Sequence, residues 1–105
     1  MNRPAVRFLD AVVTTWEAVS AASSLSSTVC QSTVKRANDD SKLTIDIQTP
    51  QFTATIASWE QAYCLDITLF ERATGSGAEL SAGECTSLEE MQERITLLCE
   101  MLAAK

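Results

Sequence analysis

The spacing of the apolar residues changes twice along this chain, and that change constrains the fold more than any other feature. Between residues 43 and 70 apolar and polar residues alternate, as they do in strands that bury one face. Over residues 4–22, and again after Ser87, apolar residues recur every three or four positions, as in amphipathic helices. The pattern therefore predicts an α+β fold.

The alternating region is expected to form a four-stranded antiparallel meander. Pro50 interrupts the alternation, residues 60–62 form a short connection, and residues 74–77 form a turn, so consecutive strands pair as hairpins. The expected strands are residues 43–48, 52–57, 63–70 and 78–84, the last with Leu80 and Ala82 pointing inward.

Each expected helix has a recognisable start and an apolar stripe. Pro4 suits the first turn of the N-terminal helix, and Ser87 with Glu90 has the spacing of a capping box. Both stripes are expected to cover the same face of the sheet, which gives a two-layer sandwich in a single domain, residues 1–105. The stripes contain Phe8, Leu9, Val12, Val13, Trp16 and Val19 in one helix, and Leu88, Met91, Ile95, Leu98 and Leu102 in the other.

The spacing of apolar residues is least informative over residues 28–42. Val29, Cys30 and Val34 are consistent with an extension of the first helix or with a short second helix, and both alternatives stay open. Residues 37–41 are expected to form a polar turn.

The chain contains no histidine, and this absence removes the usual general base and the commonest metal ligand. Its four cysteines include no CxxC pair, so neither a zinc ribbon nor a thioredoxin-like centre is expected, and the thiols are interpreted as free. Asp39-Asp40 is interpreted as a solvated turn rather than a catalytic pair. We expect no enzyme activity, no catalytic residue, no metal, no cofactor and no small-molecule substrate, and folding that needs no disulfide.

The formal net charge of −6 is distributed unevenly. Residues 37–85 carry eight acidic side chains against Lys42 and Arg72, whereas residues 1–36 are net basic. Negative charge opposes binding to nucleic acid and favours a basic protein partner. The alternative is that the acidity only keeps the protein in solution.

Residues 1–24 combine two arginines with a fairly apolar stretch, as a signal peptide would. Asp10, Trp16 and Glu17 interrupt that stretch, so an amphipathic helix explains it better and a cytoplasmic location is expected. No apolar run approaches the ~20 residues that cross a bilayer, so no membrane partner is expected.

The strand parity leaves one face of the sheet to solvent, and most residues on that face are small and polar. Trp59 and Phe70 are the large exceptions, and exposed aromatics near acids resemble an interface hot spot. Asp46, Glu60 and Asp66 are the expected flanking charges. In the alternative interpretation, Trp59 folds over a sheet edge and packs beneath the loop that follows it.

Part of the chain resembles a known family. The features are Ser58-Trp59-Glu60 at a strand end, Cys64-Leu65-Asp66 in the next strand, the Thr74-Gly75 turn and the helix after Ser87. They resemble bacterial immunity proteins encoded beside polymorphic toxins, in particular the TriTu type. The resemblance covers roughly residues 43–103.

What the resemblance implies is a cytoplasmic antitoxin that binds one cognate toxin domain, one-to-one, and blocks its active site. The toxin of that type is a secreted ADP-ribosyltransferase that modifies elongation factor Tu, an Rhs protein used in bacterial competition through type VI secretion. The alternative from a different class is a small acidic secretion chaperone, which dimerises through a helix and holds an unfolded effector segment.

Overall fold

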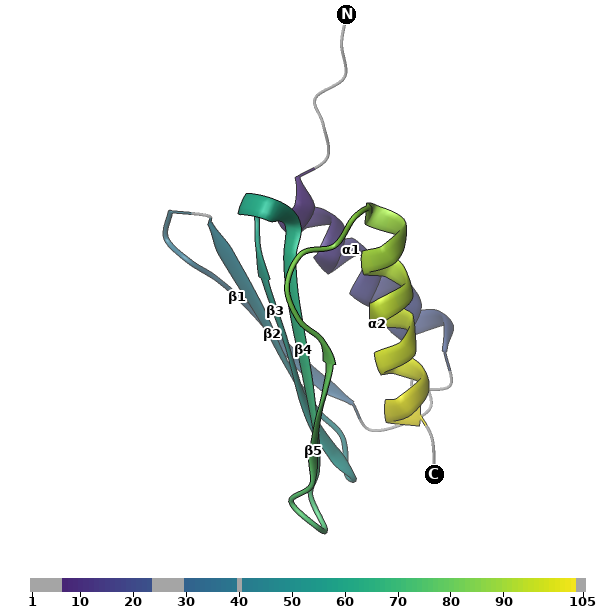
Figure 1. Cartoon of the computed structure of the whole chain (residues 1–105). Helices are drawn as coiled ribbons and strands as arrows, with labels where there is room; N and C mark the ends of the chain where they lie inside the picture. The colour runs from purple at the N-terminus through teal and green to yellow at the C-terminus, as the bar shows by residue number, and fades with distance from the viewer. Residues whose placement is uncertain (1–6, 24–29, 40, 104–105) are drawn as a thin grey trace, which may run out of the picture.

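The chain folds into two layers, a five-stranded antiparallel sheet and a pair of helices (Figure 1). The computed structural model describes residues 7–23, 30–39 and 41–103. Both helices lie on the same face of the sheet and contact each other, so the expected α+β architecture is confirmed. In chain order the elements are α1 (Phe8–Ala22), β1 (Gln31–Arg36), β2 (Lys42–Gln48), β3 (Phe52–Trp59), the 3-10 turn η2 (Gln61–Tyr63), β4 (Cys64–Glu71), β5 (Gly77–Ser81) and α2 (Leu88–Ala103).

The prediction of a helix within residues 28–42 is wrong. Gln31–Arg36 form the edge strand β1, and the sheet has five strands rather than four. All six side chains of β1 are exposed, so the strand has none of the alternation that marks a half-buried strand. It is held by pairing with β2, where Val34 lies opposite Ile45. Val29 lies outside the described residues.

The alternation is confirmed within β2, β3 and β4, where it builds the core, but Tyr63, the expected first residue of the third strand, lies in η2 and is exposed. The register places Ile45, Ile56 and Ile67 in one row across β2, β3 and β4 beneath the helices. Burying one such aliphatic side chain contributes about 1.5–3 kcal/mol, so this face and the buried stripes of the two helices together hold the layers. The buried residues of this face are Leu43, Ile45, Ile47, Ala54, Ile56, Leu65, Ile67 and Leu69.

Strand β5 departs from the expected parity because it contains a bulge. The pairing of β4 with β5 shifts between Ile67 and Thr68, which inserts Leu80 as an extra residue. After one extra residue, the inward and outward positions exchange. Ser81 is therefore buried and Ala82 is exposed, which corrects the expectation that Ala82 points inward.

The carboxylate of Glu60, at the end of β3, caps the N-terminus of α1. Its Oε2 accepts the Phe8 N–H at 2.9 Å, its Oε1 accepts the Leu9 N–H at 3.3 Å, and Arg7 Nε lies 3.5 Å from Oε1. First-turn amides have no acceptor within their own helix, and negative charge at that end also complements the helix dipole. Pro4, expected in this turn, lies outside the described residues.

Two further contacts hold α1 against the sheet. The Phe8 ring stacks on Tyr63 of η2, with ring centroids 4.8 Å apart and planes 7° from parallel. Asp10 pairs with Arg36 of β1, and this hydrogen-bonded guanidinium holds the pKa of the Asp10 carboxyl below its usual value. The start of the helix is therefore held at two places, the edge strand β1 and the connection between β3 and β4.

Helix α2 begins with the expected capping box in a modified form. Ser87 Oγ accepts the Glu90 N–H at 3.1 Å, but the Glu90 carboxylate accepts the N–H and the hydroxyl of Thr86, at 3.2 and 3.0 Å. These two hydrogen bonds hold the pKa of Glu90 below its usual value. The buried stripe consists of Met91, Ile95, Leu98, Cys99 and Leu102, whereas Leu88 of the expected stripe is exposed.

Arg94 joins α2 to the sheet through a buried hydroxyl. Its Nη1 donates to Ser81 Oγ at 2.7 Å and its Nη2 donates to Glu90 Oε1 at 2.8 Å. The Ser81 hydroxyl in turn donates to the Leu65 carbonyl at 2.8 Å. Because this hydroxyl both accepts and donates, its burial leaves no polar group unpaired.

The two helices contain 15 and 16 residues. Among the described residues, no helix has both the length and the hydropathy required to cross a bilayer.

Replacing Glu60 with alanine is expected to lower the free energy of unfolding by about 1–2 kcal/mol, in the range measured for lost N-cap side chains. Two amides of α1 lose their acceptor, and the dipole loses a compensating charge. Urea denaturation followed by circular dichroism measures the change. Glu17→Ala is the matched control, because Glu17 is an exposed acid of the same helix. Equal midpoints for the two variants would contradict the cap.

Addition of a reductant is expected to leave the melting temperature unchanged. All four cysteines are free thiols in the structure, and the core is continuous without a covalent link. Thermal unfolding in the presence and absence of a reductant is the measurement. A large drop in melting temperature on reduction would show that a disulfide stabilises the fold.

Candidate interaction surface on the open face of the sheet

The sheet face opposite the helices is polar, and no helix in the described part of the chain covers it (Figure 1). We call it the open face. Threonines are frequent on it, and their β-branched side chains favour strands while their hydroxyls remain hydrated. Two rows across the strands define the face: Lys35, Thr44, Ala57 and Asp66 in one, and Thr33, Asp46, Thr55, Thr68 and Glu79 in the other.

Trp59 stands at one end of the open face. The register places it between Lys42 on β2 and Cys64 on β4, so it keeps the outward parity expected from the sequence. The Lys42 ammonium lies 5.0 Å from the centre of the indole ring, a cation–π contact. Trp59 is half-buried rather than fully exposed, because Lys42 covers it and η2 follows directly after it.

Beside Trp59 the surface is hollowed. The hollow has a volume of about 510 Å³ and is lined by Trp59, Gln61, Cys64, Asp66 and Gly83. Asp66 Oδ1 accepts the Gly83 N–H at 3.0 Å, which fixes the segment after β5 along the rim. Two of the expected contact residues, Trp59 and Asp66, therefore line one concave site.

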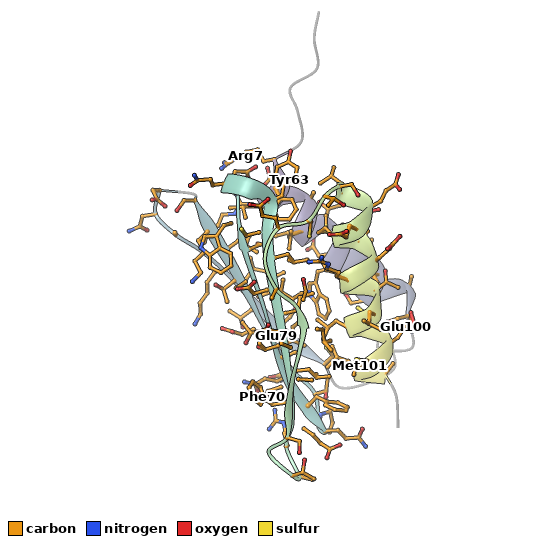
Figure 2. All side chains as sticks on the ribbon, viewed as in Figure 1. Arg7, Tyr63, Phe70, Glu79, Glu100 and Met101 are labelled. Atoms are coloured by element: carbon orange, nitrogen blue, oxygen red, sulfur yellow. The ribbon has the colours of Figure 1, made fainter. Side chains whose placement is uncertain are left out.

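Phe70 does not belong to this site. Figure 2 shows it far from Tyr63 of η2, towards the opposite end of the sheet. It pairs with Thr53, six residues before Trp59 on β3, and at about 3.3 Å per residue the two aromatics lie about 20 Å apart along the face. The ring is 48% exposed.

Part of the Phe70 ring has a structural contact. It lies over the backbone of its cross-strand partner Gly77, where an added Cβ would come within 2.4 Å of Phe70 Cε1. An aromatic placed over a glycine shields a strand position that has no side chain of its own. The exposure of Phe70 is therefore not evidence of a partner by itself.

The other two expected charges have partners within the chain. Asp46 lies 3.7 Å from Lys35 Nζ and accepts a 3.5 Å hydrogen bond from the Thr55 hydroxyl, in the middle of the open face. Glu60 turns away from the open face to cap α1. Neither role could be predicted, because the sequence alone does not show which group a charged side chain contacts.

The Lys42 contact was also missed, although the sequence contains a signal for it. The residues that flank Pro50 form a short connection, and a hairpin centred there brings Lys42 opposite Trp59. Gly83 was missed for a different reason. The bulge in β5 sets where that glycine lies against β4, and no pattern in the sequence reveals the bulge.

The four thiols differ in their surroundings. Burial raises the pKa of Cys99 to about 11, and burial also raises the pKa values of Cys30 and Cys85. Cys30 and Cys64 are both half-buried, and Cys64 lies on the wall of the hollow. Because the thiolate is the nucleophile, the buried thiols are poorly reactive near neutral pH.

The described residues contain no group of three or more histidine, cysteine, aspartate or glutamate side chains placed to hold a metal ion. No protein-family model, no curated protein and no solved structure matches this chain.

Mild alkylation of the folded protein near neutral pH is expected to modify Cys64 before Cys85 or Cys99. Cys64 is accessible from the hollow, whereas burial of Cys85 and Cys99 raises their pKa values and so disfavours the reactive thiolate there. Mass spectrometry of digested protein over a time course gives the order of labelling. In Cys64→Ser the fast phase should vanish, and fast labelling of Cys99 in the wild type would contradict the burial described here.

Proposed function

We propose that this chain is an immunity protein that binds a cognate toxin domain one-to-one and blocks its active site. In keeping with the TriTu-type resemblance, the toxin class proposed is an ADP-ribosyltransferase, and the place of action is the bacterial cytoplasm. The chain acts by contact rather than by turnover in this proposal.

One observation carries the proposal. The residues on which the resemblance depends, Ser58-Trp59-Glu60 and Cys64-Leu65-Asp66, are joined by the β3–β4 hairpin, and three of them line the hollow. If the side chains of this motif only filled the core, they would not be available to a partner. Trp59, Cys64 and Asp66 instead face outward and line the hollow.

The physical chemistry of the open face supports contact with a protein. A partly covered indole at the wall of a concave site is the kind of residue that dominates interface energies when a partner excludes water from it. The net charge of −6 favours the approach of a basic surface and raises its association rate. Asp66 and Asp46 are the proposed charge contacts of this face, and Phe70 extends the contact only if the partner spans about 20 Å.

Glu60 has a supporting role in this proposal. Its carboxylate is used by the first turn of α1, so it positions the β3–β4 connection rather than meeting the partner directly.

The second candidate function is a secretion chaperone, and one observation favours it. Leu97 is 45% exposed on the outer surface of α2 and lies beside Glu93 and Glu100 along a shallow depression. A helix that dimerises would use such an exposed leucine. The solution mass of the purified chain separates the candidates, because a stable dimer favours the chaperone and a monomer favours the immunity protein.

Trp59→Ala and Asp66→Lys are expected to weaken the toxin complex in different ways. Loss of Trp59 should cost about 2 kcal/mol, or about 30-fold in Kd, mainly through faster dissociation. Reversal of Asp66 should slow association, and the effect should shrink at high salt because exposed charges are then screened. Binding kinetics against the toxin domain at two salt concentrations measure both changes.

Glu17→Lys is the matched control for Asp66→Lys, because it makes the same charge change on α1, away from the open face. Circular dichroism confirms that each variant is folded. If both open-face variants fold and bind as the wild type does, the open face is not the interface. If Glu17→Lys slows association as much as Asp66→Lys does, only net charge matters and the site is not localised.

A further inference from the structure

The hollow beside Trp59 has a chemical character that its individual residues do not have alone. Its wall combines an aromatic ring, a carboxylate and the Gln61 side chain, and none of its lining residues carries a positive charge. The hollow is open to solvent, and its volume of about 510 Å³ is large enough for one long side chain of a partner to lie in it.

The Asp66 carboxylate is held in place through one of its two oxygens. Its Oδ1 accepts the Gly83 N–H at 3.0 Å, and no described residue donates to Oδ2. A carboxylate fixed through one oxygen loses little freedom when a second donor arrives. It is therefore prepared to accept a hydrogen bond from a cation that enters the hollow.

The Trp59 ring already binds a cation of this chain. Lys42 approaches it at 5.0 Å from the β2 side of the register, whereas Cys64, Asp66 and Gly83 lie on the β4 side. Lys42 is exposed, so solvent screens its repulsion of a second cation. The ring is thus positioned so that a planar cation can stack on it while contacting Asp66.

We propose that the hollow is a recognition pocket for one arginine side chain of a protein partner. The guanidinium stacks on the Trp59 indole and donates to Asp66 Oδ2, while the alkyl stem lies along the apolar wall. Arginine suits this arrangement better than lysine, because its flat guanidinium stacks and donates in its own plane at the same time. The identity of the partner as a toxin rests on the proposed function, but the chemistry of the pocket does not.

The test uses the whole chain and a blocked arginine, N-acetyl-arginine amide, as the probe. The indole N–H signals of Trp59 and Trp16 are followed by NMR in the isotopically labelled protein. Trp16 is buried and serves as the internal reference. The expected result is a saturable shift of the Trp59 indole and of the Gly83 amide, with the Trp16 indole unchanged.

Two matched comparisons make the test specific. N-acetyl-citrulline amide has the same shape without the charge, and it should produce no saturable shift. Asp66→Asn keeps an oxygen for the Gly83 N–H but loses the charge, and it should weaken arginine binding at least about tenfold, the factor that corresponds to one lost charge-assisted hydrogen bond. Glu79→Gln removes another exposed acid of the open face and should leave binding unchanged.

Several results would overturn the proposal. They are the absence of a saturable shift with arginine, equal binding of citrulline or of N-acetyl-lysine amide, or an equal loss in Glu79→Gln and Asp66→Asn. If arginine fails to bind while Trp59→Ala still weakens a toxin complex, the pocket assignment is wrong and the open face remains the interface. If arginine binds but no toxin does, the pocket stands and the proposed function fails.

Discussion

The buried apolar side chains of β2, β3 and β4 lie on one face of the sheet, and that face must be shielded from water. Helices of 15 and 16 residues are about 22–24 Å long, close to the length of an eight-residue strand. Two such helices packed side by side, about 10 Å apart, cover about 20 Å of width, which is about four strands. The fifth strand, β1, lies at the edge of this cover, where α1 reaches it through the polar pairs Asp10–Arg36 and Trp16–Ser32, and its six side chains remain exposed.

The connection between β3 and β4 links the two faces of the molecule. Glu60 follows β3 in a helical backbone conformation at the start of η2, and its carboxylate turns towards α1. Its neighbour Trp59, the last residue of β3, keeps the outward parity of the strand. Tyr63, which ends η2, adopts φ +49°, a left-handed conformation that is uncommon for a bulky residue, and its stacking on Phe8 offsets that cost. The contacts of α1 therefore also determine where η2 stands beside the hollow.

The strands β2 to β4 and both helices could be predicted from the sequence, because burial of one face gives the apolar residues a regular spacing along each element. Strand β1 could not be predicted in this way, since pairing with β2 holds it and Val34 is as exposed as its polar neighbours. The site was predicted in part. Strand parity placed Trp59 and Asp66 on the same face, but the partners of Glu60 and Asp46 are set by the tertiary fold. The end of β5 was misassigned because one inserted residue, Leu80, changes which side chains face inward after it.

The distance along the chain between α1 and its cap has a consequence for synthesis. The amide of Phe8 and its acceptor on Glu60 are separated by 52 residues. At about 5–20 residues per second, the ribosome adds that stretch in about 3–10 s, and during this interval the nascent helix has neither its carboxylate nor a sheet to lie on. An amphipathic segment of 15 residues is marginal alone in water, so α1 becomes a lasting helix only after the hairpin that carries Glu60 has been made. Helix α1 thus takes its place only after the segment that carries Glu60 has been made.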